Sequence, residues 1–312
     1  MQRAALFTVV PMVLVSAAQA APPAQALKYH EALLKRPNNE ALFERFFGAW
    51  LDEQPQEALE IFLTDRAKEH GGQEWAILAR YQLRRGQEEA ALESLGKAIA
   101  SAPEDPALAM ERGKLRLRRL DFNGAREDLA KVAAGKDETL ALEAGKLVGK
   151  AWLRQGNSEE AVKAWDALLA AHAADEDLLE DLVETAASEG AMNQALGYAD
   201  KLIAATKDPY QKAVRGMRKG DLLAKAGRND DALAAYSGTL KEVGEGSWLE
   251  HELLAQVEKI FRKQDRLDHL RKELVKLAEK YPRRLLIKRQ FGEAGGGTGG
   301  DGLPPSAVSG KS

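Results

Sequence analysis

Residues 72–103, GQEWAILARYQLRRGQEEAALESLGKAIASAP, contain two short helix patterns separated by one glycine. The first pattern places its apolar side chains on one helical face, at Trp75, Leu78 and Ala79. The second does the same with i, i+4, i+7 spacing, at Ala91, Leu95 and Ala98. Gly86 supplies the turn between them, and Pro103 cannot continue the second helix. The stretch therefore predicts a helix–turn–helix unit.

This unit recurs along the chain, with starts near residues 39, 72, 106, 142, 176, 213 and 251. The eighth place holds a small residue at Ala79, Gly113, Gly149 and Gly220. The twentieth place holds alanine at Ala58, Ala91, Ala125, Ala161, Ala195 and Ala232. Four places later stands a bulky residue at Phe62, Leu95, Leu129, Trp165 and Tyr236, with Ala199 as a weak member. The turn glycines are Gly86, Gly156, Gly190 and Gly227. We expect the small places to let the two helices approach closely and the bulky place to fill the space between stacked units.

The pattern resembles the tetratricopeptide repeat family, whose unit of about 34 residues follows the pattern W-x2-L-G-x2-Y, A-x3-F, P. The resemblance covers about residues 24–285 and is loosest at both ends; in the last unit Leu270 replaces the small alanine. It implies an all-α fold, an α-solenoid of about seven tetratricopeptide-like helix–turn–helix repeats, in which first helices line a concave groove. The longer unit spacings predict extra residues in the turns at 173–177 and 243–248, with Ser247 as an N-cap.

The two ends of the chain differ from the repeats. Residues 1–20 carry Arg3, an apolar run over 4–15 and the small-x-small sequence that ends at Ala20, which predicts a signal peptide cleaved after Ala20 and a periplasmic or secreted protein. An uncleaved membrane anchor is the alternative. Residues 21–38 are expected to form an N-terminal capping helix, residues 39–285 the repeat array, and the Gly/Pro-rich residues 286–312 a flexible tail or linker.

Composition excludes several classes of function. The 312 residues are 45% hydrophobic and 30% charged, which is typical of a globular chain rather than a disordered one. A formal net charge of −3 does not suggest nucleic-acid binding. The chain has no cysteine, which excludes disulfides and thiolate catalysis. The five histidines have no metal-site spacing, and no nucleophile elbow or phosphate-loop motif is present. We therefore expect no enzyme activity, no cofactor and no metal site.

Cations recur at two places of the first helices. Place nine is Arg80, Lys114 and Lys150, and place thirteen is Arg84, Arg118 and Arg154. These places are i, i+4 on one helix face, so stacking would give two basic columns. The groove positions implied by the resemblance, and so the predicted partner-binding residues, are Arg80, Leu83, Arg84, Met110, Lys114, Leu117, Arg118, Lys150, Leu153 and Arg154. Such columns suit an acidic, partly apolar peptide. The alternative is that these cations only solvate an exposed helix face.

Two other clusters have alternative interpretations. In the fifth unit the corresponding face is acidic, at Glu180, Asp181 and Glu184; either it fixes the orientation of a bound peptide or it matches the helix dipole and is solvated. In the first unit the face is aromatic, at Phe43, Phe46, Phe47 and Trp50; either it packs under the helix predicted at 25–36 or it is an apolar docking patch.

The sequence therefore favours a protein–protein interaction scaffold in the bacterial envelope that binds a protein or peptide partner, possibly an acidic one, through its concave groove. It predicts no nucleic-acid partner and no membrane span in the mature chain, and it does not indicate an oligomeric state. One alternative is a substrate-positioning or regulatory arm of an enzyme whose catalytic domain lies outside this chain. Another is direct binding of an anionic envelope polymer by the basic columns, which would weaken steeply with salt.

Overall fold

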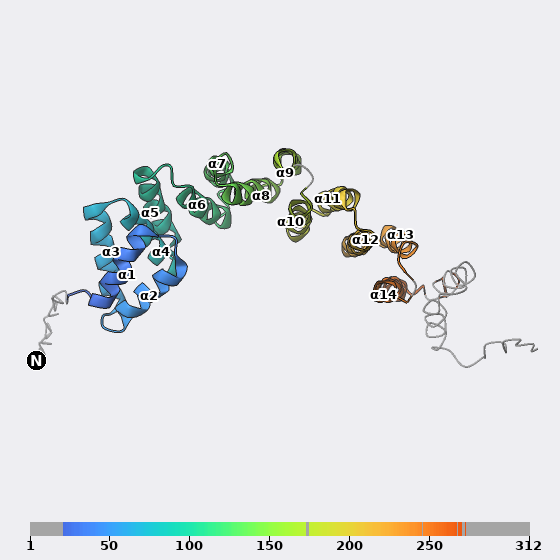
Figure 1. The fold of residues 1–312 in the computed structure, drawn as a ribbon, viewed down its shortest axis with the longest axis horizontal. Helices are drawn as coiled ribbons and strands as arrows, with labels where there is room; N and C mark the ends of the chain where they lie inside the picture. Colours follow the sequence, from blue (N-terminus) through green and yellow to red (C-terminus); the bar gives the residue numbers. More distant parts are fainter. Residues whose placement is uncertain (1–20, 173–174, 245, 267, 270–271, 273–312) are drawn as a thin grey trace, which may run out of the picture. The chain divides into compact units, whose positions relative to one another are not determined.

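The computed structural model describes residues 21–172, 175–244, 246–266, 268–269 and 272. Within these residues every regular element is an α-helix, so the predicted all-α fold is confirmed (Figure 1). None of the described helices is long and apolar enough to cross a membrane. The predicted signal peptide at 1–20 and the predicted tail at 286–312 lie outside the described residues.

The chain divides into two compact units, Met1–Val148 and Gly149–Ser312, and the division falls inside α8 (Glu138–Arg154). The helices of the first unit are α1 (Ala24–Lys35), α2 (Glu40–Leu51), α3 (Gln56–His70), α4 (Gln73–Arg84), α5 (Glu88–Ser101), α6 (Pro106–Arg118) and α7 (Phe122–Ala133). Those of the second unit, after the end of α8, are α9 (Ser158–Ala171), α10 (Glu176–Ser188), α11 (Met192–Ala205), α12 (Pro209–Lys225), α13 (Asn229–Leu240) and α14 (Trp248–Lys263).

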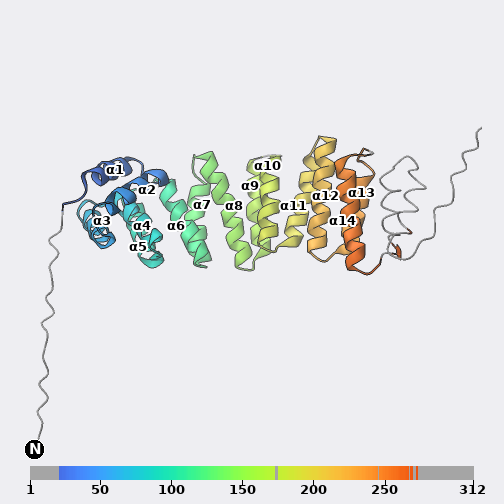
Figure 2. The ribbon, with the colours of Figure 1, turned by 90° about the horizontal axis from the view of Figure 1, so that it is seen from below.

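Successive helices pack as hairpins, as the repeat predicts. Helix α4 packs on α5 and α6 on α7 in the first unit, and α10 packs on α11 and α12 on α13 in the second. In the second unit the first helices α10, α12 and α14 form one layer and the second helices α9, α11 and α13 the other (Figure 1). Figure 2 shows the helices of this unit side by side. In the second unit the first helices α10, α12 and α14 therefore lie on the same side of the stack and form one surface.

The small and bulky places of the repeat pack directly on one another. A Cβ built on Gly113 would stand 2.8 Å from Leu129 Cγ. On Gly149 it would overlap the Trp165 indole, and on Gly220 the Tyr236 ring. In each case the bulky residue lies 16 positions after the glycine, on the second helix of the same repeat. The bulky residues, predicted to fill the space between stacked repeats, thus also fill the seam inside their own hairpin.

The turn glycines have the left-handed backbone that their place requires. Gly86, Gly156, Gly190 and Gly227 have φ values of 71°, 84°, 76° and 76°. Without a Cβ, glycine adopts this region at no steric cost. The third repeat has Leu120 at the same place, with φ 64°. The turn geometry therefore follows from the stacking of the hairpins, and Leu120 adopts it despite its side chain.

The longer repeats differ in part from the prediction. Helix α4 has 12 residues, whereas α8 and α12 have 17 and α14 has 16. Most of the extra length therefore lies in the first helices rather than in the turns. In α12 the reason is local: the Asp208 side chain accepts the Gln211 N–H at 2.7 Å, and Pro209 stands at the first helical position. Ser247 caps α14 as predicted, accepting the Glu250 N–H at 3.2 Å.

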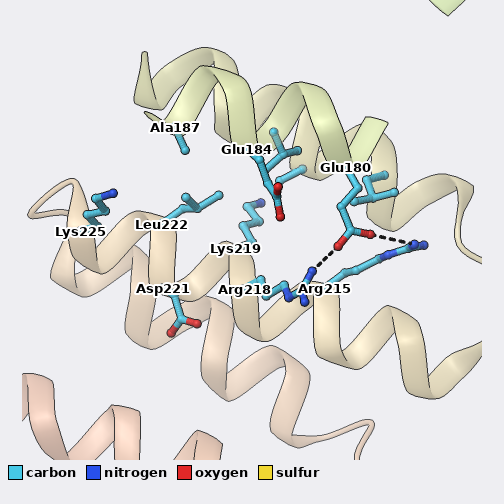
Figure 3. A pocket seen from close by; sticks show the side chains of 12 residues that line it. Glu180, Glu184, Ala187, Arg215, Arg218, Lys219, Asp221, Leu222 and Lys225 are labelled. Atoms are coloured by element: carbon cyan, nitrogen blue, oxygen red, sulfur yellow. Dashed lines mark hydrogen bonds and ion pairs between the residues drawn. The ribbon is translucent and has the colours of Figure 1, made fainter. Parts of the chain in front are cut away.

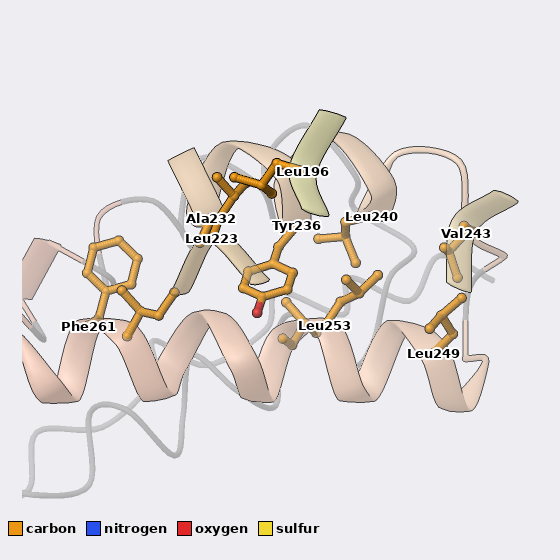
Figure 4. Close-up of a cluster of buried hydrophobic side chains, with 12 residues drawn as sticks. Leu196, Leu223, Ala232, Tyr236, Leu240, Val243, Leu249, Leu253 and Phe261 are labelled. Atoms are coloured by element: carbon orange, nitrogen blue, oxygen red, sulfur yellow. The ribbon is translucent and has the colours of Figure 1, made fainter. Parts of the chain in front are cut away.

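The aromatic first repeat forms a closed core with α1. Phe43, Phe46, Phe47 and Trp50 are buried in one cluster that also contains Ala26 and Leu33 of α1. The packing interpretation of these aromatic residues is therefore confirmed, and the docking-patch interpretation is wrong. A comparable cluster in the second unit surrounds Tyr236, with Leu223 of α12 and Leu253 of α14 against it (Figure 4).

Candidate functional site

A hollow opens in the second unit where the fifth repeat departs from the pattern. Its bulky place is Ala199 and its small place is Val183, the reverse of the Gly149–Trp165 and Gly220–Tyr236 arrangement. Because Ala199 does not fill the seam, a cavity of about 270 Å³ remains between α10, α11 and α12. Its lining residues are Glu180, Val183, Glu184, Ala187, Ala199, Leu202, Arg215, Arg218, Lys219, Asp221, Leu222 and Lys225.

The hollow has an apolar interior and a charged rim. Ala187 of α10 and Leu222 of α12 lie across from one another (Figure 3). At one end of the rim Glu180 forms ion pairs with Arg215, at 3.4 Å, and with Arg218. Lys219 is engaged by Asp200 of α11 at 2.5 Å. The Glu180 pairs thus join α10 to α12, and the Asp200 pair joins α11 to α12.

Apart from Asp221, which accepts a hydrogen bond from the Tyr236 hydroxyl, two charged residues of the rim have no ion-pair partner among the described residues. They are Glu184 on α10 and Lys225 on α12, and both are exposed. Elsewhere on these two helices Glu176, Glu180, Arg215 and Arg218 pair with one another. The rim therefore offers one negative and one positive group to a ligand.

A second cavity continues the first-helix face toward α14. It has a volume of about 390 Å³ and shares Asp221 and Lys225 with the hollow. Lys259 and Lys263 of α14 join Lys225 around it, and none of the three lysines has an ion-pair partner in the described part of the chain. On its wall the Tyr236 hydroxyl donates to Asp221 at 2.6 Å. Burial raises the pKa of Asp221, which the Tyr236 hydrogen bond and the charge of Lys259 only partly oppose. This cavity favours anions.

In the compact unit Met1–Val148, the cations predicted at places nine and thirteen of the repeats are all paired within the chain. Arg80 lies 3.3 Å from Glu40, and Lys114 lies 2.5 Å from Glu143. The Arg84–Glu44 pair and the 3.6 Å Arg118–Glu88 pair complete the set. Arg84 also lies over the Phe47 ring, 4.1 Å from its centroid. An acidic partner would have to displace these carboxylates, so this predicted site stays a prediction.

In the compact unit Gly149–Ser312, the two predicted cations Lys150 and Arg154 share one carboxylate. Arg154 donates to Glu189 through Nε at 2.8 Å and Nη2 at 2.9 Å, and Lys150 lies 2.8 Å from the same group. The Arg154 hydrogen bonds, together with the charge of Lys150, lower the pKa of Glu189 to about 2 despite its burial. Glu189 is therefore ionised at neutral pH, and both cations are bound to it.

The four apolar predicted residues divide into two kinds. Met110 and Leu117 are 4% and 5% exposed, so they belong to the core and offer a partner almost no surface. Leu83 and Leu153 are half-buried and remain accessible. Met110 and Leu117 share one side of α6 with Lys114, but the neighbouring helices cover them, and a repeat register gives the place along a helix without saying which of its residues the stack covers.

The acidic cluster has both structural and site roles. Asp175 caps α10 by accepting the N–H groups of Asp177 and Leu178 at 2.9 and 3.1 Å, which agrees with the dipole interpretation. Glu176 and Glu180 are bound by Arg215 rather than simply solvated. Glu184 lines the hollow, as the interpretation of an acidic groove wall expects.

The sequence contains a signal for Lys225, Lys259 and Lys263, which the predicted set of partner-binding residues omits. Lys259 and Lys263 occupy places nine and thirteen of the last repeat, and Lys225 occupies place thirteen of the sixth. The same register that selected Arg80 and Arg84 would have selected them had it been followed past the acidic fifth repeat. Ala199 was recognised as an exception, and exceptions at a packing position predict cavities.

No protein-family model and no curated protein matches the chain. Solved repeat structures are similar to it. It is 18% identical to a tetratricopeptide repeat protein from Parabacteroides merdae, with a TM-score of 0.39, over 75% of this chain and 91% of that one. It is 15% identical to PilW, a widely conserved type IV pilus biogenesis factor, with a TM-score of 0.40, over 73% and 94%. The helix hairpins of the described residues form a tetratricopeptide-like repeat fold. With the Cut9–Hcn1 hetero-tetramer of the APC/C it shares 14% identity and a TM-score of 0.37, over 86% of this chain and 52%, about half, of that one. These similarities concern the fold alone.

Proposed function

We propose that the chain is a protein–protein interaction scaffold of the bacterial envelope, which holds a segment of a partner protein in the first-helix groove of its second unit. The observation that carries the proposal is the hollow beside Ala199, which is apolar inside and has unpaired charges on its rim. The signal sequence predicted at residues 1–20 supports a periplasmic or secreted location after cleavage at Ala20.

The chemistry of the groove indicates what such a segment contains. An apolar side chain fits between Val183 and Leu222, where burying it from water supplies affinity. Acidic side chains next to it would face Lys225, Lys259 and Lys263. The opposite sign of Glu184 disfavours an acidic segment that runs in the reverse direction, which fixes the orientation.

Site-specific photo-cross-linking tests this proposal. A photo-reactive amino acid is placed at Ala187, which lines the hollow, in the full chain expressed in its source organism. The matched control carries the same amino acid at the neighbouring exposed Ser188, which does not line it. We expect a discrete adduct with one partner protein at position 187 and none at position 188.

Two substitutions then link the adduct to the groove. Ala199→Leu fills the hollow and should abolish the adduct, while Gly197→Ala on the same helix, where a Cβ meets open space, should leave it intact. Replacing Lys225, Lys259 and Lys263 by glutamine should weaken it. An adduct that forms equally at both positions, or that persists in Ala199→Leu, would exclude the hollow as the binding site.

A further inference from the structure

A third hollow lies outside the groove, between α1 and α2 in the first unit. It has a volume of about 650 Å³, and four cations line it: Lys28, Lys35, Arg36 and Arg45. All four are exposed. Glu31 is the one acidic residue in its lining, so the hollow has a formal charge of +3. The remaining lining residues are neutral: Ala32, Asn39, Ala41 and Leu42.

The cations of this hollow differ from those on the groove-facing helices α4 and α6. On α4 and α6, Arg80, Arg84, Arg112 and Lys114 each have a carboxylate partner. In the described residues none of the four cations of the α1–α2 hollow forms an ion pair. The two acidic residues of α2 that flank it, Glu40 and Glu44, are already bound by Arg80 and Arg84.

The arrangement concentrates positive potential on one face. Lys28, Glu31, Ala32 and Lys35 have i, i+3, i+4, i+7 spacing and so share one side of α1. Lys28 and Lys35 are two turns apart, about 10 Å along the axis, which is about the Debye length at 0.1 M salt. Their repulsion is therefore only partly screened, and a concave surface further focuses the field. A multivalent anion would relieve it.

We propose that this hollow, defined by Lys28, Lys35, Arg36 and Arg45, docks the chain on an anionic phospholipid surface. Charge complementarity identifies the class of ligand, and the order of the chain favours a membrane over a soluble polyanion. The apolar run at residues 4–15 ends nine residues before Ala24, the first residue of α1, a distance of about 30 Å at full extension. Before cleavage after Ala20, while that run is engaged with a bilayer, α1 is the first described element within reach of the headgroups. The site is separate from the groove and does not depend on its occupant.

Vesicle binding by the full chain tests the proposal. Wild type is titrated with vesicles of phosphatidylcholine alone and with vesicles containing 30 mol% phosphatidylglycerol. One variant replaces Lys28, Lys35, Arg36 and Arg45 by glutamine. The matched control replaces by glutamine four other exposed lysines that have no ion-pair partner in the described residues and lie outside the three hollows, which gives the same net charge: Lys131, Lys136, Lys207 and Lys241.

We expect wild type and the matched control to prefer the anionic vesicles. Each basic residue near such a surface contributes about a fivefold effect, so the α1–α2 variant, which loses four, should lose affinity by about 600-fold if the effects add. The preference should also fall as salt is raised. Circular dichroism of both variants verifies that the helices are intact. Because Arg3 and the amino terminus also attract anionic lipid and are the same in all three proteins, the α1–α2 hollow is assigned only the difference in excess anionic binding between wild type and each variant.

Three results would overturn the proposal. The first is equal binding of wild type to neutral and anionic vesicles. The second is an equal loss in both variants, which would assign the effect to net charge alone. The third is tight binding of the α1–α2 hollow to a soluble polyanion such as polyphosphate without excess binding to anionic vesicles, which would assign the hollow to a different class of ligand.

Discussion

The indole of Trp165 lies directly against Gly149, at the point where α9 crosses α8. A Cβ on Gly149 would overlap Trp165 Nε1, and Trp165 is completely buried. The glycine is therefore required by the ring, although glycine in a helix normally costs about 1 kcal/mol relative to alanine. The same relationship joins Gly113 to Leu129 and Gly220 to Tyr236, which makes it the repeating seam of the fold.

Gly149→Ala should therefore destabilise the protein. Overpacking a tight seam costs about 1–3 kcal/mol, which exceeds the gain in helix propensity. Urea unfolding followed by circular dichroism measures the change. Gly197→Ala is the matched control, because its Cβ meets open space in the middle of α11, and it should stabilise by about 0.5–1 kcal/mol. Changes of the same sign in both variants would contradict the assigned seam.

Leu120→Gly should stabilise the protein. Leu120 is 66% exposed, so the substitution removes little packing, and it relieves a left-handed backbone with φ 64°. That strain is about 1–2 kcal/mol, of which the greater flexibility of glycine in the unfolded chain cancels about half. We expect a net gain of about 0.5–1 kcal/mol in thermal or urea unfolding. The reciprocal Gly156→Leu should lose stability, and a gain in that variant would show that the turn carries no strain.

The repeated packing positions made the hairpins predictable from sequence. Gly149 and Trp165 report on a contact that recurs at Gly113–Leu129 and Gly220–Tyr236, so the period alone locates both helices and the turn. The departure at Ala199 was visible too, and it marks the hollow of the groove. The repeat pattern predicts only contacts that recur from one repeat to the next. A contact that occurs once leaves no recurring residue in the sequence, so the pattern cannot predict it.

The charged contacts show this limit. His30 and Glu74 are 44 residues apart, and their 2.8 Å contact depends on how α1 folds back over α4. The carboxylates that occupy the predicted basic columns, such as Glu44 on Arg84, likewise come from neighbouring helices. Sequence spacing places side chains on one face of a helix, whereas the partner of each charge depends on the stacking of different helices.

Glu74→Ala should be strongly destabilising. Glu74 is 2% exposed, and it accepts from Arg66 Nε at 3.0 Å as well as contacting His30. Burial raises its pKa, but His30 and Arg66 together outweigh that effect and lower it, so the carboxylate is charged. Removing it leaves His30 buried without its partner, at a cost of about 3 kcal/mol. Glu69→Ala on the exposed side of α3 is the control and should change stability by less than about 0.5 kcal/mol. Similar values for the two variants would refute a buried network.

Glu189→Gln tests both the electrostatics and the predicted basic site. The folded-state pKa of Glu189 is about 2, below the ordinary value of 4.5, so its ionised form stabilises the fold at pH above 4.5. That contribution is lost as the pH falls through 2, because the carboxyl group is then protonated in both states. With partly exposed partners we expect the variant to be about 1–2 kcal/mol less stable at pH 7. The difference should shrink between pH 4.5 and pH 2.

Urea unfolding at pH 7, 4.5 and 2.5 measures this difference, with Glu127→Gln, an exposed carboxylate without an ion-pair partner in the described chain, as the control. A difference that does not depend on pH would mean that packing, not charge, explains the loss. The same variant frees Lys150 and Arg154. If these cations hold an acidic partner as the sequence predicts, Glu189→Gln should bind that partner more tightly, because the internal competitor is gone. Unchanged or weaker binding would remove Lys150 and Arg154 from the partner-binding surface and leave the groove around Lys225 as the binding site.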